Sequence, residues 1–245
     1  MEINNYSNIS IDYVLNNLLE TAKQDLNVSK ELYKKGYYAP SLFYLQQGLE
    51  KLNKYLYGRI MYPSMSISKL EKLFMELGHN FTKSIQKTLS NSLKQLKRYT
   101  NKNSDVYTEL ESYLRQFNEK LMSVAKAQVD FSALKGSLNS VETFSSCGMN
   151  LISSELNQIE PILKKSNYNL NIDLVYLTNN IKSILKAFYI QFFFDRYDLI
   201  SMVRYPTKSN KYTSPYKYYN KDNEFVKEFK YIHEQISKIL KDIEK

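Results

Sequence analysis

The stretch that decides the fold is Ala22–Tyr57, AKQDLNVSKELYKKGYYAPSLFYLQQGLEKLNKYLY. Apolar residues recur in it at steps of three and four, the spacing that places them on one face of an α-helix. The pattern stops at Lys35-Gly36-Tyr37 and resumes before Leu42. Glycine often ends a helix, and Pro40 suits the first turn of the next one. The stretch therefore predicts two antiparallel helices joined by a short turn.

The same periodicity continues along most of the chain. No segment shows the period of two that marks a half-buried strand. Caps, glycines and prolines suggest where each helix begins and ends. The expected helices span about 10–35, 39–60, 66–77, 82–99, 173–202 and 223–244. A long helical pattern covers 105–156, with Gly136 and Gly148 as candidate breaks. These patterns predict an all-α fold.

The net charge of the chain is compatible with several classes of binding partner. The 245-residue chain has a formal charge of +9, and its lysines are spread over every expected helix. A basic surface attracts the phosphates of nucleotides, RNA, DNA or anionic lipid. A solvated lysine-rich surface explains the same charge equally well, so the composition alone does not choose between the two.

Several other classes are disfavoured by composition. Cys147 is the only cysteine, so no intramolecular disulfide forms, and two histidines with one cysteine argue against a His/Cys zinc site. Glycine loops that bind dinucleotides or triphosphates are absent. We therefore expect no metal and no cofactor. Because apolar runs are short and the N-terminus is polar, we expect a cytoplasmic protein without membrane contact.

Three groups of residues occur in the order found in HEPN-domain proteins. The first resembles the first helical hairpin of the family: Asp25-Leu26, Gly36-Tyr37, Ala39, then Phe43-x2-Gln46-Gln47-x2-Glu50-Lys51-x2-Lys54. The second, Gly78-His79-Asn80, resembles the turn after that hairpin. The third, Arg204-Tyr205-Pro206 with Pro215-Tyr216-x-Tyr218-Tyr219, resembles the closing segment of the prokaryotic family.

The resemblance implies a HEPN-like antiparallel helical bundle with a long helical insertion. We expect 1–100 to form the first part of the bundle, 101–170 a helical insertion or arm, and 171–245 the closing helices, packed on the hairpin. It also implies a nucleotide- or RNA-binding or protein-interaction module in toxin–antitoxin or antiviral defence. The implied partners are a second copy, in a homodimer, and a small nucleotidyltransferase.

Many HEPN proteins are RNases that carry an arginine followed, after four to six residues, by a histidine. Histidine can accept the 2′-hydroxyl proton near neutral pH, and arginine can stabilise the phosphate. This chain lacks the pair. Lys72 precedes His79 with six residues between them, but lysine lacks the bidentate fork of arginine, and His79 matches the structural turn. A metal-independent endoribonuclease using Lys72, His79 and Arg204 is one alternative, and a purely structural helical dimer is another.

Candidate binding residues lie in VRYPTKSNKYTSPYKYYNK, 203–221, where cations and rings alternate with little acid. Such a mixture suits stacked bases and phosphates. The expected nucleotide or RNA contacts are Arg204, Tyr205, Lys208, Lys211, Tyr216 and Tyr219, with Lys51 and Lys54 of the second helix. Alternatively, the tyrosines pack the loop on the bundle and Arg204 bonds a carboxylate such as Asp195, Asp198 or Glu50. The polar residues of the hairpin, including Lys51 and Lys54, then form a network that fixes helix pairing.

Overall fold

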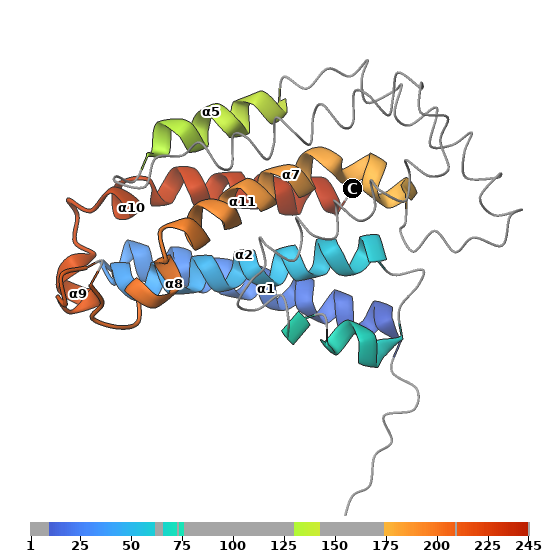
Figure 1. Cartoon of the computed structure of the whole chain (residues 1–245), viewed down its shortest axis with the longest axis horizontal. Coiled ribbons are helices and arrows are strands. Elements are labelled where there is room, and N and C mark those ends of the chain that lie inside the picture. The colour runs from blue at the N-terminus through green and yellow to red at the C-terminus, as the bar shows by residue number, and fades with distance from the viewer. Residues whose placement is uncertain are drawn as a thin grey trace, which may run out of the picture.

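The computed structural model describes residues 10–61, 66–72, 74–75, 130–142, 174–208 and 210–244. Within these ranges the chain is mostly helical and contains no strand, so the all-α prediction is confirmed (Figure 1). The helices are α1 (Ile11–Lys34), α2 (Tyr38–Met61), α5 (Phe131–Glu142), α7 (Leu174–Arg196), α8 (Leu199–Met202), α9 (Pro215–Tyr218), α10 (Glu224–Lys227) and α11 (Phe229–Ile243).

The predicted hairpin is present as α1 and α2, each 24 residues long. Ser10 caps α1, because its side chain accepts a hydrogen bond of 3.1 Å from the backbone N–H of Tyr13. At the other end the Tyr37 N–H donates to the Leu32 carbonyl at 2.9 Å. Gly36 has a φ of 80°, the left-handed conformation that reverses the chain after a helix. The turn thus satisfies the last carbonyls of α1 and starts α2 antiparallel to it.

Small residues let α1 and α2 approach closely. A Cβ on Gly48 would lie 2.9 Å from Leu26 Cγ and 3.1 Å from the Ala22 carbonyl oxygen. Between the helices, the hydroxyl of the fully buried Ser29 donates to the Ser41 carbonyl at 2.8 Å. A larger residue at position 48 would therefore push the helices apart.

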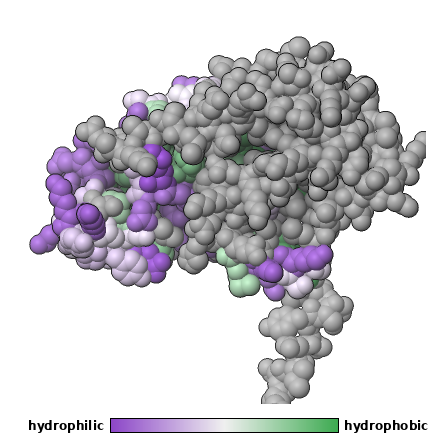
Figure 2. Space-filling view, in the orientation of Figure 1, coloured by the Kyte–Doolittle hydropathy of each residue, from purple (hydrophilic) through white to green (hydrophobic). Residues whose placement is uncertain are grey.

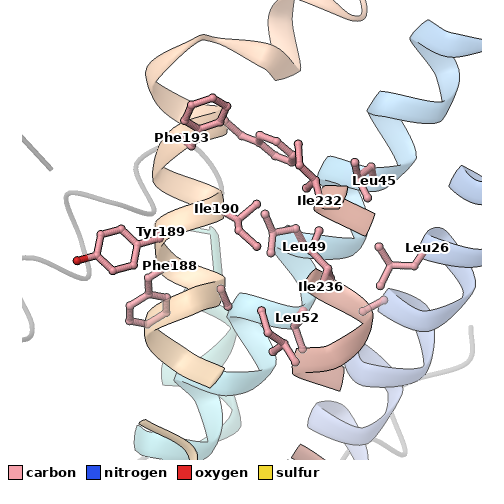
Figure 3. Close-up of a cluster of buried hydrophobic side chains, with 14 of the residues drawn as sticks. Leu26, Leu45, Leu49, Leu52, Phe188, Tyr189, Ile190, Phe193, Ile232 and Ile236 are labelled. Atoms are coloured by element: carbon pink, nitrogen blue, oxygen red, sulfur yellow. The ribbon is translucent and has the colours of Figure 1, made fainter. Parts of the chain in front are cut away.

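The closing helices pack on this hairpin and share one core with it. In Figure 3, Leu45, Leu49 and Leu52 of α2 lie among side chains of α7 and α11; the labelled partners include Ile190, Phe193, Ile232 and Ile236. The rings of Tyr33 in α1 and Phe229 in α11 stack with centroids 4.2 Å apart. The two ends of the chain therefore form a single bundle, as the resemblance implied.

Two expected helices are interrupted. The apolar pattern predicts one helix over 173–202, but α7 ends at Arg196 and α8 begins at Leu199. Asp198 lies between them with a φ of 48°, a left-handed conformation that a short polar side chain tolerates better than most. The last helix is likewise divided at Glu228 into α10 and α11. Apolar spacing continues through both breaks, so periodicity alone could not locate them.

Of the expected insertion, the structure describes only 130–142. This part forms α5, whose buried Phe131, Leu134, Leu138 and Val141 pack in the common core beside α7. Residues 67–72 and 74–75 are helical, within the helix expected over 66–77. The expected helix over 82–99 and the rest of 105–156 lie outside the described residues. The division at 101 and 170 stays a prediction.

Candidate nucleic-acid interface

The segment between α8 and α10 closes one end of the bundle. It carries α9, which packs on α2 and lies at the same end as the turn between α1 and α2 (Figure 1). Figure 2 shows mostly hydrophilic residues over this end of the molecule. We call residues 204–217 the end loop.

Asn210 organises the end loop from within. It is fully buried, and its Nδ2 donates to the carbonyls of Tyr205 at 2.9 Å and Met202 at 3.4 Å. Its Oδ1 accepts from the Thr207 N–H at 2.7 Å. One side chain thereby satisfies three backbone groups, and the Tyr212 N–H adds a bond of 2.7 Å to the Thr207 carbonyl. The loop is folded back on itself and braced.

The tip of the end loop holds two residues in a strained conformation. Lys211 and Tyr212 both have a φ of 54°. For residues with a Cβ, the left-handed region costs roughly 1–2 kcal/mol each, so consecutive examples persist only where surrounding bonds enforce them. Here the Lys211 N–H bonds the Lys208 carbonyl at 3.0 Å, and the Asn210 brace fixes the residues before it. Both side chains are exposed, so the strained conformation presents them to solvent.

Arg204 lies on aromatic rings. Its guanidinium carbon is 5.6 Å from the ring centre of Phe43 on α2 and 5.2 Å from that of Tyr205. Both distances fall within the range of a cation–π interaction. The expected alternative, a bond from Arg204 to Asp195, Asp198 or Glu50, is not found. Glu50 instead accepts from Lys54, and Asp195 accepts from Gln191.

The end loop carries positive charge and contains no acidic residue. Residues 204–221 include five cations and no aspartate or glutamate. Arg204, Lys208, Lys211 and Lys217 are exposed and form no ion pair with any residue in the described ranges. Three tyrosines stand among them, with 55% of Tyr205, 72% of Tyr212 and 70% of Tyr216 exposed. Cations and open rings on one surface can bind phosphates and stack bases.

Tyr219 corrects one expectation. It is 1% exposed and therefore packs the loop on the bundle, where it cannot contact a ligand. Burial raises the pKa of its hydroxyl, with further contributions from Tyr218 and Asp198. That hydroxyl has no hydrogen-bond partner in the described part of the chain.

Lys51 and Lys54 both form ion pairs with carboxylates, and only the pair of Lys51 joins two helices. Lys51 forms an ion pair with Asp25 of α1, and Lys54 pairs with Glu50 at 2.7 Å, one turn away on α2. All four side chains are mostly buried. The expected pairing of polar residues across the hairpin is found for Lys51, whereas Lys54 is paired within α2, and carboxylates match the charges of both.

Two of the three expected catalytic residues, Lys72 and Arg204, lie apart within one chain. Leu70 and Phe74, on either side of Lys72, lie beside Gly58 of α2, whereas Arg204 lies over Phe43. Fifteen residues separate positions 43 and 58, about 22 Å along a helix. Lys72 is exposed near one end of the bundle and Arg204 near the other. His79 lies outside the described residues.

The second histidine is a packing residue. His233 donates from Nε2 to the Leu26 carbonyl at 3.0 Å, which ties α11 to α1. Burial lowers its pKa, the Leu26 bond opposes that shift, and nearby Lys30 adds to it. In the described ranges no group of histidine, cysteine, aspartate or glutamate could hold a metal ion. No helix there is long and apolar enough to cross a bilayer.

Fold and surface together define an α-helical bundle protein with a basic, tyrosine-rich end. Residues 15–135 match the family model described as HEPN domain, a match that runs from α1 into α5. The chain therefore belongs to the HEPN-domain family, and this membership supports a role connected with nucleotides or RNA. No curated protein and no solved structure matches the chain.

Sequence reasoning missed three residues of this surface. Phe43 was assigned to the hairpin, yet its ring supports Arg204 from the other half of the chain. Tyr212 is not among the binding residues that the sequence predicts, although it is the most exposed of the three tyrosines of the end loop. The sequence alone could have indicated the role of Asn210, because asparagine side chains often bond nearby backbone groups in turns.

Proposed function

We propose that the chain is a nucleotide- or RNA-binding HEPN protein and that the end loop is its contact surface. The observation that carries the proposal is the position of Arg204, which is exposed on Phe43 and Tyr205 among cations that lack carboxylate partners in the described ranges. A guanidinium held on rings keeps its donors aimed at solvent, where a phosphate can accept them.

The same surface predicts how binding depends on salt. A protein that neutralises phosphates releases condensed counterions, so its affinity falls as salt rises. Arg204 with Lys208, Lys211 and Lys217 supplies up to four such contacts. If all four engage, the affinity for RNA should fall by more than tenfold between about 50 and 200 mM salt.

Fluorescence anisotropy with labelled RNA tests the proposal directly. Arg204→Gln should weaken binding and reduce the salt slope by about one contact. Lys230→Gln is the matched control, because Lys230 is an exposed cation on α11 outside the end loop. The proposal is wrong if wild type binds neither RNA nor nucleotides at low salt, or if both variants behave alike.

We propose binding without cleavage as the main activity. The family's arginine–histidine pair is lacking in the sequence. Phe43, which contacts Arg204, and Gly58, which lies beside residues on either side of Lys72, are about 22 Å apart along α2. RNA incubated with the protein in a chelator should therefore stay intact. Cleavage that disappears in His79→Ala and Arg204→Ala would favour the divergent endoribonuclease instead.

The biological setting is a proposal that membership of the family supports. We propose that the protein acts in the cytoplasm, in toxin–antitoxin or antiviral defence, as a homodimer that meets a small nucleotidyltransferase. Light scattering of the purified chain tests the dimer. Co-purification with a nucleotidyltransferase encoded beside it tests the partner, and each result is independent of RNA binding.

A further inference from the structure

The three exposed tyrosines of the end loop form separate platforms. None of the rings of Tyr205, Tyr212 and Tyr216 contacts another aromatic ring among the described residues. The Tyr205 ring contacts the Arg204 guanidinium. Each of these residues is more than half exposed, so each ring has accessible surface on which a base can stack.

From this arrangement we infer that the ligand is a single-stranded oligonucleotide, which lies across the end loop with successive bases on these rings. The inference rests on the proposed function and names its substrate class. A mononucleotide has one base and would leave two platforms unused. A duplex keeps its base faces inside the stack and offers its backbone and the edges of its bases, on which a ring cannot stack. A flexible single strand can place several bases on separate rings while its phosphates meet the interleaved lysines.

Tyr212 is the central contact of this platform. Tyr212 and Lys211 both have a φ of 54°, which is an unfavourable backbone conformation. Neither side chain is buried, so packing of these side chains in the core does not offset the cost. The brace around Asn210 enforces the conformation, and its result is an exposed ring beside an exposed cation. Strain of this kind orders the loop before the ligand arrives, which reduces the entropy lost on binding.

Competition anisotropy with the full chain tests the inference. The probes are an RNA of about eight nucleotides, DNA of the same sequence, a hairpin duplex and a mononucleotide. The octamer should bind much more tightly than the mononucleotide. Tyr212→Ala should weaken octamer binding about tenfold, whereas Tyr212→Phe, which keeps the ring, should stay within about twofold. Tyr13→Ala is the control, because Tyr13 is 62% exposed on α1, outside the end loop.

A glycine variant distinguishes a loss of affinity caused by removing the ring from one caused by misfolding. Tyr212→Gly should raise the melting temperature, because glycine adopts positive φ without steric cost, yet it should lose octamer affinity like Tyr212→Ala. Equal binding of RNA and DNA octamers would support single-strand stacking and show that the 2′-hydroxyl is not read. If wild type binds RNA but Tyr212→Ala matches it, or if the mononucleotide competes as well as the octamer, this inference fails and the proposed function stands. If no probe binds, both fail.

Discussion

Tyr33 of α1 and Phe229 of α11 stack face to face, with ring centroids 4.2 Å apart and planes 5° from parallel. The Tyr33 hydroxyl continues the contact by donating to the Val226 carbonyl at 3.1 Å. Phe229 is 2% exposed. One aromatic pair thus joins α1 to α11. Removing it should therefore lower the stability of the whole bundle.

Phe229→Ala should destabilise the protein by about 3–5 kcal/mol, because it removes a buried ring and leaves a cavity. Tyr33→Phe keeps the stack and loses only the hydrogen bond, so it should cost about 1 kcal/mol. Urea unfolding followed by circular dichroism measures both values. Equal losses for the two variants would mean that the stack contributes little.

Gly48→Ala should destabilise by about 1–3 kcal/mol, because the added methyl lies against Leu26 and the Ala22 carbonyl. Gly136→Ala is the matched change in α5, where nothing lies within 4 Å of an added Cβ. It should stabilise the helix by about 0.5–1 kcal/mol. Opposite signs in thermal unfolding would verify the close approach of α1 and α2, and a stable Gly48→Ala would refute it.

Lys51→Met should lower stability and leave RNA affinity unchanged. The substitution leaves the mostly buried Asp25 without its partner, which costs about 1–3 kcal/mol. Urea unfolding and RNA anisotropy on the same preparation separate the two effects. Weaker RNA binding with unchanged stability would instead show that Lys51 contacts RNA.

Asn210→Ala should reduce both stability and oligonucleotide affinity. It removes bonds to the backbone of Tyr205 and Thr207, so the end loop loses its brace. A loss of about 1–3 kcal/mol is expected from the buried groups left without partners. Hydrogen exchange would report faster opening within 204–213, whereas an unchanged rate there would show that other bonds hold the loop.

His233 makes stability depend on pH in a known direction. Its pKa in the folded protein is lowered, so the unfolded chain binds the proton more readily. This contribution is complete above the unfolded pKa of about 6.5 and is lost as pH falls from there toward the folded pKa. His233→Gln should flatten that part of the curve of unfolding free energy against pH. If the two curves stay parallel, the assignment is wrong.

The local sequence was enough to determine the hairpin. Gly36, Pro40 and the apolar steps on either side act within a few residues, so their consequences could be predicted without knowing the rest of the fold. The same residues carried the family resemblance, which the match over 15–135 bears out. Periodicity also predicted an all-α chain, because it reports which face of each helix is apolar.

Only the tertiary structure decided what each polar and aromatic residue does. Tyr212 and Tyr219 lie in the same segment between α8 and α10 and have the same side chain, yet one is 72% exposed and the other 1%. Lys51 is paired with Asp25 across the hairpin, whereas Lys211 forms no ion pair with any residue that the structure describes. Burial and ion pairing depend on which parts of the chain that are distant in sequence come into contact, as Arg204 contacts Phe43. The spacing of neighbouring residues does not determine such contacts.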